Sequence, residues 1–173
     1  EKYYINVCQT HPLSASAEVQ FAVAYGHQGG SGSDTDSAAV EGPTEAVYKF
    51  WANTLLPENE VTGGFVISSP SIDSAVATGK DTEIYVLVAN RELMKDRLNK
   101  KNWTIALTGS LSNGSGSRVL RLTDDSNTVP ATPTPAGPRY NIITGSQGIG
   151  LAGSSSAAYK NWGHFYPDQG VLV

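Results

Sequence analysis

The sequence predicts one mainly β domain over residues 1–173, either a β-sandwich or a mixed antiparallel sheet, with two short helices at about 44–56 and 91–98. Short runs of β-branched and aromatic residues recur along the chain, and turns rich in Gly, Ser and Pro separate them. Charged residues make up 16% of the chain and hydrophobic residues 39%, which is too apolar for a disordered chain. We therefore expect about seven to nine strands around one core.

The N-terminal third predicts two strands followed by a helix. Residues 3–8 and 18–25 alternate apolar and polar side chains, as half-buried strands do. The polar, Gly-rich segment 26–36 is expected to be a loop that is mobile or ordered by a partner. The helix at 44–56 ends before Pro57, and its apolar stripe is expected to consist of Val47, Tyr48, Trp51, Leu55 and Leu56.

The central stretch, residues 82–109, predicts a strand, a short helix and a second strand. Residues 83–89 are almost uninterruptedly apolar, which is typical of a strand buried on both faces. Asn90 is expected to cap the helix at 91–98, because its side chain can accept hydrogen bonds from the amides of the first turn. Residues 103–108 alternate again and predict a half-buried strand. A further candidate strand at 65–68 precedes this stretch.

The last third predicts additional antiparallel strands and a proline-rich arm. Asn113-Gly114 is a hairpin signal, so residues 118–122 are expected to pair back onto the strand at 103–108. Residues 129–138 contain four prolines and are expected to form an exposed arm or loop outside the sheet. Strands are expected at 140–144 and 170–173. These strand-like ends indicate either a segment of a longer chain or termini that pair with neighbouring subunits.

Composition argues against several classes of function. The net charge is −4 and no basic cluster exceeds Lys100-Lys101, so nucleic-acid binding is not expected. No apolar run approaches the roughly 20 residues of a membrane helix, and we expect no membrane partner. Cys8 is the only cysteine, which excludes an internal disulfide and favours a small buried residue over a reactive thiol.

The residues that could carry chemistry do not form a convincing site. Residues 148–153 match the pattern G-x-G-x-x-G, but the segment after Gly153 is too short and interrupted for the crossover helix of a dinucleotide-binding unit. His27, His164 and Asp168 could ligate a metal, yet no pair has a local ligand spacing. Asp124-Asp125 are adjacent on a turn and favour a cap over a glycosidase pair. We predict no catalytic, cofactor-binding or metal-ligating residue.

The aromatic concentration at residues 159–168 supports two interpretations. If it is buried, it belongs to the core or to an intersubunit contact, which is the interpretation we favour. If it is exposed, it could stack on sugars. The predicted partner or glycan contacts are Trp162, His164, Tyr166 and His27.

Six segments of the chain, taken in order, resemble a known family: residues 17–33, 44–57, 84–109, 122–126, 139–146 and 166–173. Together they resemble the virion structural proteins of contractile-tailed phages, especially phages of cyanobacteria and other marine bacteria. The resemblance implies a non-enzymatic tail or baseplate component, located in the virion, whose partners are other virion proteins and copies of itself in a symmetric assembly. It brings no catalytic residues with it.

Two rival functions remain open. The first is a glycan-binding or receptor-binding domain of a tail fibre, which would use Trp162, Tyr166 and the loop at 26–36. The second is a hydrolase, for which the sequence offers neither a metal cluster nor a catalytic triad.

Overall fold

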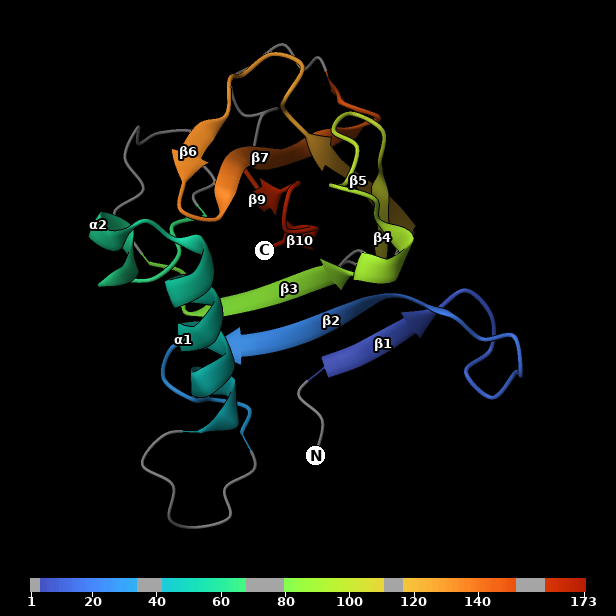
Figure 1. Cartoon of the computed structure of the whole chain (residues 1–173), viewed down its shortest axis with the longest axis horizontal. Helices are drawn as coiled ribbons and strands as arrows, with labels where there is room; N and C mark the ends of the chain where they lie inside the picture. The colour runs from blue at the N-terminus through green and yellow to red at the C-terminus, as the bar shows by residue number, and fades with distance from the viewer. Residues whose placement is uncertain (1–3, 34–41, 68–79, 111–116, 152–160) are drawn as a thin grey trace.

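The computed structural model describes residues 4–33, 42–67, 80–110, 117–151 and 161–173. The fold is mainly β, as predicted, and consists of one curled antiparallel sheet flanked by two short helices (Figure 1). The strand order is β1-β2-β3-β10-β9-β7-β5-β4, and β6 and β8 both pair with β7. The helical elements are α1 (Pro43–Leu55), α2 (Glu58–Val61) and the 3₁₀ turn η1 (Arg91–Leu93). The strands are β1 (Tyr4–Cys8), β2 (Val19–His27), β3 (Glu83–Ala89), β4 (Ile105–Ser110), β5 (Ser117–Asp124), β6 (Thr132–Thr134), β7 (Gly137–Ser146), β8 (Ile149–Gly150), β9 (Gly163–Tyr166) and β10 (Val171–Leu172).

The last strand of the described chain joins the two halves of the sheet. β10 lies between β3 and β9, so that Leu172 is opposite both Leu87 and Phe165. On one side of β10 the sheet consists of the N-terminal strands β1 to β3, and on the other it consists of β9, β7, β5 and β4. The prediction of a strand at 170–173 is confirmed, and this strand occupies a central position.

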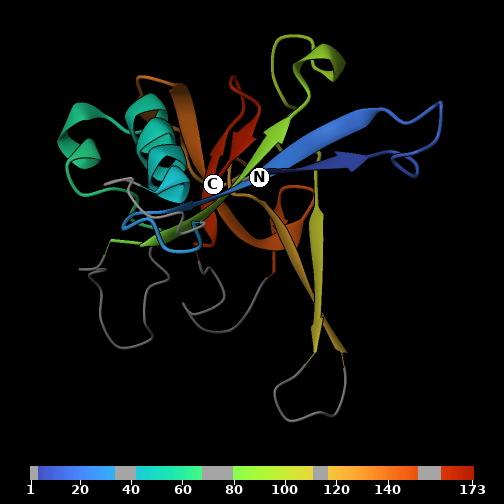
Figure 2. The same ribbon diagram turned by 90° about the horizontal axis from the view of Figure 1, so that it is seen from below.

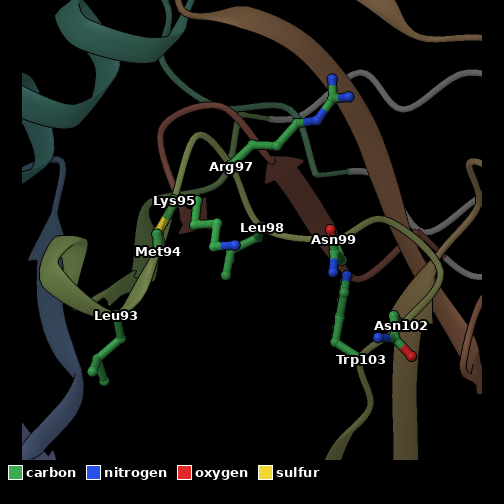
Figure 3. Close-up of a pocket in the computed structure, with 8 residues that line it drawn as sticks. All are labelled: Leu93, Met94, Lys95, Arg97, Leu98, Asn99, Asn102 and Trp103. Atoms are coloured by element: carbon green, nitrogen blue, oxygen red, sulfur yellow. The ribbon is translucent and has the colours of Figure 1, made fainter.

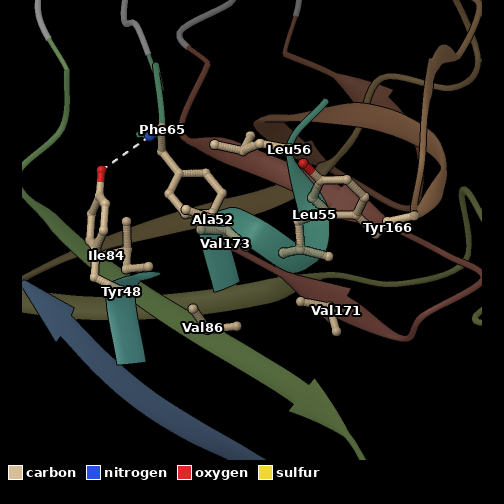
Figure 4. Packing of buried hydrophobic residues seen from close by; sticks show 11 residues of the cluster. Tyr48, Ala52, Leu55, Leu56, Phe65, Ile84, Val86, Tyr166, Val171 and Val173 are labelled. Atoms are coloured by element: carbon tan, nitrogen blue, oxygen red, sulfur yellow. Dashed lines mark hydrogen bonds between the residues drawn. The ribbon is translucent and has the colours of Figure 1, made fainter. Parts of the chain in front are cut away.

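Helix α1 covers one face of the sheet near β2 and β3. Tyr48 packs with Ile84 and Phe65 in the larger core cluster, and its hydroxyl accepts from Phe65 N at 3.0 Å (Figure 4). The close approach depends on Gly26 of β2, because a Cβ atom there would lie 3.0 Å from Tyr48 N. The residues of α1 that are fully buried are Thr44, Tyr48, Ala52 and Leu55.

This buried side of α1 differs from the predicted stripe. Val47 and Trp51 are only part-buried, with Trp51 at the margin of the cluster, whereas Thr44 and Ala52 are buried. Close contact between a helix and a sheet favours small side chains, and a search for large apolar residues at helical spacing overlooks them. The prediction of the helix itself is confirmed, including its end before Pro57.

A second core cluster lies on the opposite face of the sheet. Its fully buried members include Phe165 and Leu172, and Leu87 of β3 packs against them. Ile84 and Val86 point the other way, since successive side chains of a strand face opposite sides of the sheet. The prediction that residues 83–89 are buried on both faces is wrong for the outer part of β3, where Tyr85 is 65% exposed.

The segment at 91–98 forms one 3₁₀ turn instead of the predicted two-turn helix. Asn90 caps this turn as predicted, because its side chain accepts from Glu92 N at 3.1 Å. The chain beyond Leu93 is held by a distant partner: Leu98 N donates to Pro167 O at 3.0 Å. Short helices are marginal on their own, so a single long-range contact is enough to favour another conformation.

The proline-rich run takes part in the sheet, contrary to the prediction. Thr132 pairs with Arg139, and Thr134 pairs with Gly137, so β6 and β7 form a hairpin. Pro133 and Pro138 oppose each other as the middle pair of this three-pair ladder. A missing N–H is tolerated in an antiparallel pair whose residues do not exchange backbone hydrogen bonds. The predicted strand at 65–68 is absent from its described part, residues 65–67, where Phe65 fills the core from an irregular segment.

The antiparallel pairing of β4 with β5 confirms the predicted contact between residues 118–122 and 103–108. The turn that was expected at Asn113-Gly114 lies outside the described residues. No helix in the described ranges is long and apolar enough to span a membrane.

Candidate functional site

Two of the four predicted contact residues, His164 and Tyr166, lie inside the subunit. His164 is 4% exposed and Tyr166 is 0% exposed, so neither can reach a sugar or partner at the surface of this subunit. Their polar neighbours are Arg139 and Glu60, which form an ion pair with a guanidinium–carboxylate distance of 2.8 Å. Burial, aided by the positive charge of Arg139, lowers the pKa of His164 to about 4, so its imidazole is neutral near pH 7.

The other two predicted residues do not join them. Trp162 is 43% exposed, and its indole N–H donates to Thr144 Oγ1 at 2.9 Å. His27 ends β2 and organises the following turn, where its Nδ1 accepts from Gly29 N at 3.0 Å and Ser31 N at 3.2 Å. β3 and β10 separate β2 from β9, so His27 and His164 lie three strands apart in the sheet. The structure therefore does not gather the four residues into one surface.

Asp124 and Asp125 are buried and hold backbone groups, which agrees with the turn role predicted for them. Asp124 Oδ1 accepts from Lys101 N at 2.8 Å. Asp125 accepts from Asn141 N at 3.0 Å and from Asn141 Nδ2 at 2.8 Å. Burial raises the pKa of Asp125, and the hydrogen bonds from Asn141 offset part of that rise.

The glycine-rich motif at 148–153 has no free amide at its first position. Gly148 N donates to Thr123 Oγ1 at 2.8 Å, in the tight turn that joins β7 to β8. A phosphate-binding loop needs its amides free to point at the anion. Residues 152 and 153 of this motif lie outside the described residues. In the described ranges, no three His, Cys, Asp or Glu side chains come close enough to hold a metal ion.

The main surface feature is an apolar groove that the sequence analysis did not predict. It has a volume of about 820 Å³ and lies on the face of the sheet opposite α1. Phe21 and Val23 of β2 form one side, and Leu87 and Leu172 form the floor. Residues 104–107 form the other side, and the segment from Asn90 to Trp103 closes one end. None of the described residues that line this groove is charged.

The floor of the groove belongs to a continuous row of apolar side chains across the sheet. Paired positions run from Ile5 in β1 through Val23, Leu87 and Leu172 to Phe165 in β9. Directly opposite residues on neighbouring strands lie on the same face, so this row crosses five strands. Exposure increases along it from 0% at Phe165 to 71% at Ile5. The buried core of this face thus opens without interruption onto its exposed part.

A smaller hollow of about 380 Å³ adjoins the closed end of the groove (Figure 3). The two share Leu93, Met94, Leu98 and Trp103, and the hollow adds Lys95 and Arg97. Both cations lie in the segment that the sequence predicted as a helix. Beyond η1 this segment is irregular, and it places two positively charged residues next to an uncharged groove. The prediction of a helix did not indicate this placement.

The groove could not be found from the sequence because it is made by strands that are distant in the chain. Its walls come from β2 and β4, and β10 lies in its floor. The one available signal was β3, whose apolar residues predicted burial on both faces although only one face is fully covered.

In comparisons with known proteins, no family, curated protein or solved structure matches this chain.

Proposed function

We propose that this protein is a non-enzymatic subunit of a protein assembly and that it acts through contacts of its sheet with neighbouring subunits. The observation that supports this proposal is the apolar face of β1 to β3, which is continuous with the core and only partly covered. Ile5 is 71% exposed on this face, and Tyr85 is 65% exposed. Contiguous exposed apolar surface on a folded domain is typical of a protein contact.

The ends of the sheet support the same proposal. β1 and β4 are the terminal strands, and neither has a second strand partner in the described part of the chain. Such strands present free backbone donors and acceptors that can pair with another chain. Figure 2 shows that the β1–β2 hairpin and the β4–β5 ribbon leave the body of the molecule in different directions. Two open edges on one subunit suit a contact that is repeated from copy to copy.

The particle that we propose for this subunit is the virion of a contractile-tailed phage, in its tail or baseplate. Six ordered segments, from residues 17–33 to residues 166–173, carry the resemblance to virion proteins of that kind. The proposed partners are other virion proteins and further copies of this chain. A subunit of this type needs large contact surfaces and no reactive cluster.

Sedimentation of the purified chain over a range of concentrations tests the assembly role. We expect concentration-dependent association, and we expect Ile5→Lys or Tyr85→Lys to shift it toward the monomer because each introduces a charge into the apolar face. Leu13→Lys is the matched control, since Leu13 is 89% exposed on a turn outside this face. A wild-type chain that stays monomeric at every concentration and is absent from purified particles would contradict the proposal.

A further inference from the structure

The wall that β4 gives to the groove is an edge of backbone. Thr104, Ile105, Ala106 and Leu107 all line the groove, although they are consecutive. Thr104 precedes β4, and the other three belong to it. Successive side chains of a strand point to opposite sides, so three consecutive strand residues meet one groove along the edge of the strand. β4 pairs with β5 along its other edge. The groove therefore has apolar side chains as its floor, and one wall is a strand edge that has no strand partner among the described residues.

This combination selects among possible occupants. A purely apolar chain, such as a lipid tail, would cover the peptide groups of β4 without giving them hydrogen bonds, and burying unpaired polar groups is costly. A highly charged ligand would find no counter-charge along the uncharged lining. An extended peptide meets both requirements, because its backbone can pair with β4 while every second side chain enters the apolar groove.

The closed end of the groove adds a charge preference. Residues 91–101 contain five of the chain's twelve Lys and Arg residues but only two of its sixteen acidic residues. This segment is thus basic in a chain whose net charge is −4. Lys95 and Arg97 line the hollow that continues the groove. An acidic side chain or a carboxyl group at that end of the peptide would complement them.

We propose that the groove is a strand-addition site for an extended segment of a neighbouring protein. The segment pairs with the free edge of β4, places alternate apolar side chains over Phe21, Val23 and Leu87, and carries an acidic residue beside Lys95 and Arg97. The paired stretch of four residues spans roughly 13 Å. This inference rests on the proposed assembly role and specifies one of its contacts.

A short fluorescein-labelled peptide that alternates valine and threonine after two glutamates is a direct probe. We expect its fluorescence anisotropy to rise on titration with the full chain, and hydrogen exchange at residues 104–107 to slow when it binds. A peptide of the same sequence in which every valine and threonine is N-methylated keeps the side chains but has no backbone donor for a ladder, and it is expected not to bind. Equal binding of both peptides would overturn strand pairing.

Charge reversal tests the polarity of the site. In the double variant Lys95→Glu with Arg97→Glu, both changes are at exposed positions, and we expect affinity for the glutamate peptide to fall about tenfold at low salt. A peptide with two lysines in place of the glutamates is expected to bind this variant better than it binds the wild type. If the double variant binds both peptides as the wild type does, the proposal that the bound segment carries an acidic residue beside Lys95 and Arg97 is wrong.

Occupation of the groove is tested by Phe21→Lys, with Phe50→Lys as the control. Phe21 lines the groove, whereas Phe50 is a 59% exposed aromatic residue on α1 outside it. We expect the first variant to lose peptide binding and the second to keep it, with circular dichroism showing that both are folded. If Phe21→Lys does not fold, Val23→Lys replaces it. Binding of oleate but not of the peptide would overturn the proposal in favour of an amphiphile site.

Two further measurements separate this inference from the proposed function. In the chain alone, slow exchange at those amides of residues 104–107 that point away from β5 would show that the outer edge is already covered, which overturns the strand-addition site. Concentration-dependent association without peptide binding would leave the assembly role standing and remove this site. Peptide binding by a chain that never associates and is absent from particles would support the site and contradict the assembly role.

Discussion

His164 is a buried neutral base, and its environment couples stability to pH. The groups that act on it are the Arg139 guanidinium, the Glu60 carboxylate and a backbone hydrogen bond at Val66. Because burial lowers the pKa of His164 from 6.5 to about 4, the unfolded chain takes up a proton first as the pH falls. The stability that this group contributes is therefore complete above pH 6.5 and is lost as the pH falls toward 4.

We expect the free energy of unfolding to decrease by about 2.5 kcal/mol on account of His164 between about pH 7.5 and about pH 4.5. Urea unfolding followed by tryptophan fluorescence at the two pH values measures this change. His164→Gln, which does not titrate, is expected to remove most of the slope. Asp125 acts in the opposite direction near the acid end, because its raised pKa makes protonation favour the folded state. An unchanged slope in His164→Gln would assign the effect to another group.

Gly26 sets the distance between β2 and α1. A Cβ atom at this position would lie 3.0 Å from Tyr48 N and 3.1 Å from Ile84 Cγ1, and the backbone of α1 cannot move without disturbing the core. We expect Gly26→Ala to destabilise the protein by about 1–3 kcal/mol in urea unfolding. Gly109→Ala is the matched control, since no atom lies within 4 Å of its added Cβ. A similar loss in both variants would mean that strand conformation, not the helix contact, is responsible.

In helix α1, the most hydrophobic side chains are not always the most buried ones. The sequence alone predicts that Trp51→Ala costs about 3–5 kcal/mol, as for a buried core residue. In the structure Trp51 is part-buried at the margin of the core, whereas Leu55 is fully buried. We therefore expect about 1–2 kcal/mol for Trp51→Ala and about 3–4 kcal/mol for Leu55→Ala. Urea unfolding of the two variants checks the order, and a larger loss at Trp51 would contradict it.

The elements that the sequence predicted are those whose local pattern agrees with their final environment. β3 has the predicted bounds 83–89, and α1 lies where the helix was predicted, because the local spacing of apolar residues marks each element even though it did not identify all of their buried residues. The prediction was wrong where a contact with another segment determines the backbone conformation. Leu98 N donates to Pro167 O, and β6 is a strand because it pairs with β7. The candidate site belongs to this second kind. Its groove depends on β10 being inserted beside β3, and no local pattern in the chain records that insertion.

At the scale of the whole molecule, β10 connects the two halves of the sheet. Leu172 is opposite Leu87 on one side and Phe165 on the other, and its side chain belongs to the core beneath the groove. If the two halves of the sheet unfold only together, a destabilising substitution in β10 must lower the free energy of opening of both halves by the same amount. Unequal weakening would instead show that one half is stable without the other.

We expect Leu172→Ala to cost about 3 kcal/mol and to accelerate hydrogen exchange equally in β3 and β7, which lie on opposite sides of β10. Leu107→Ala provides the control, since Leu107 is 51% exposed on the terminal strand β4 and its truncation is expected to change exchange near β4 alone. Hydrogen exchange followed by mass spectrometry distinguishes the two patterns. Faster exchange confined to β9 and β7 in Leu172→Ala would show that β1 to β3 and α1 form a unit that is stable without the other strands. In that case β4, which lines the groove, could separate from β2 and β3 without unfolding them.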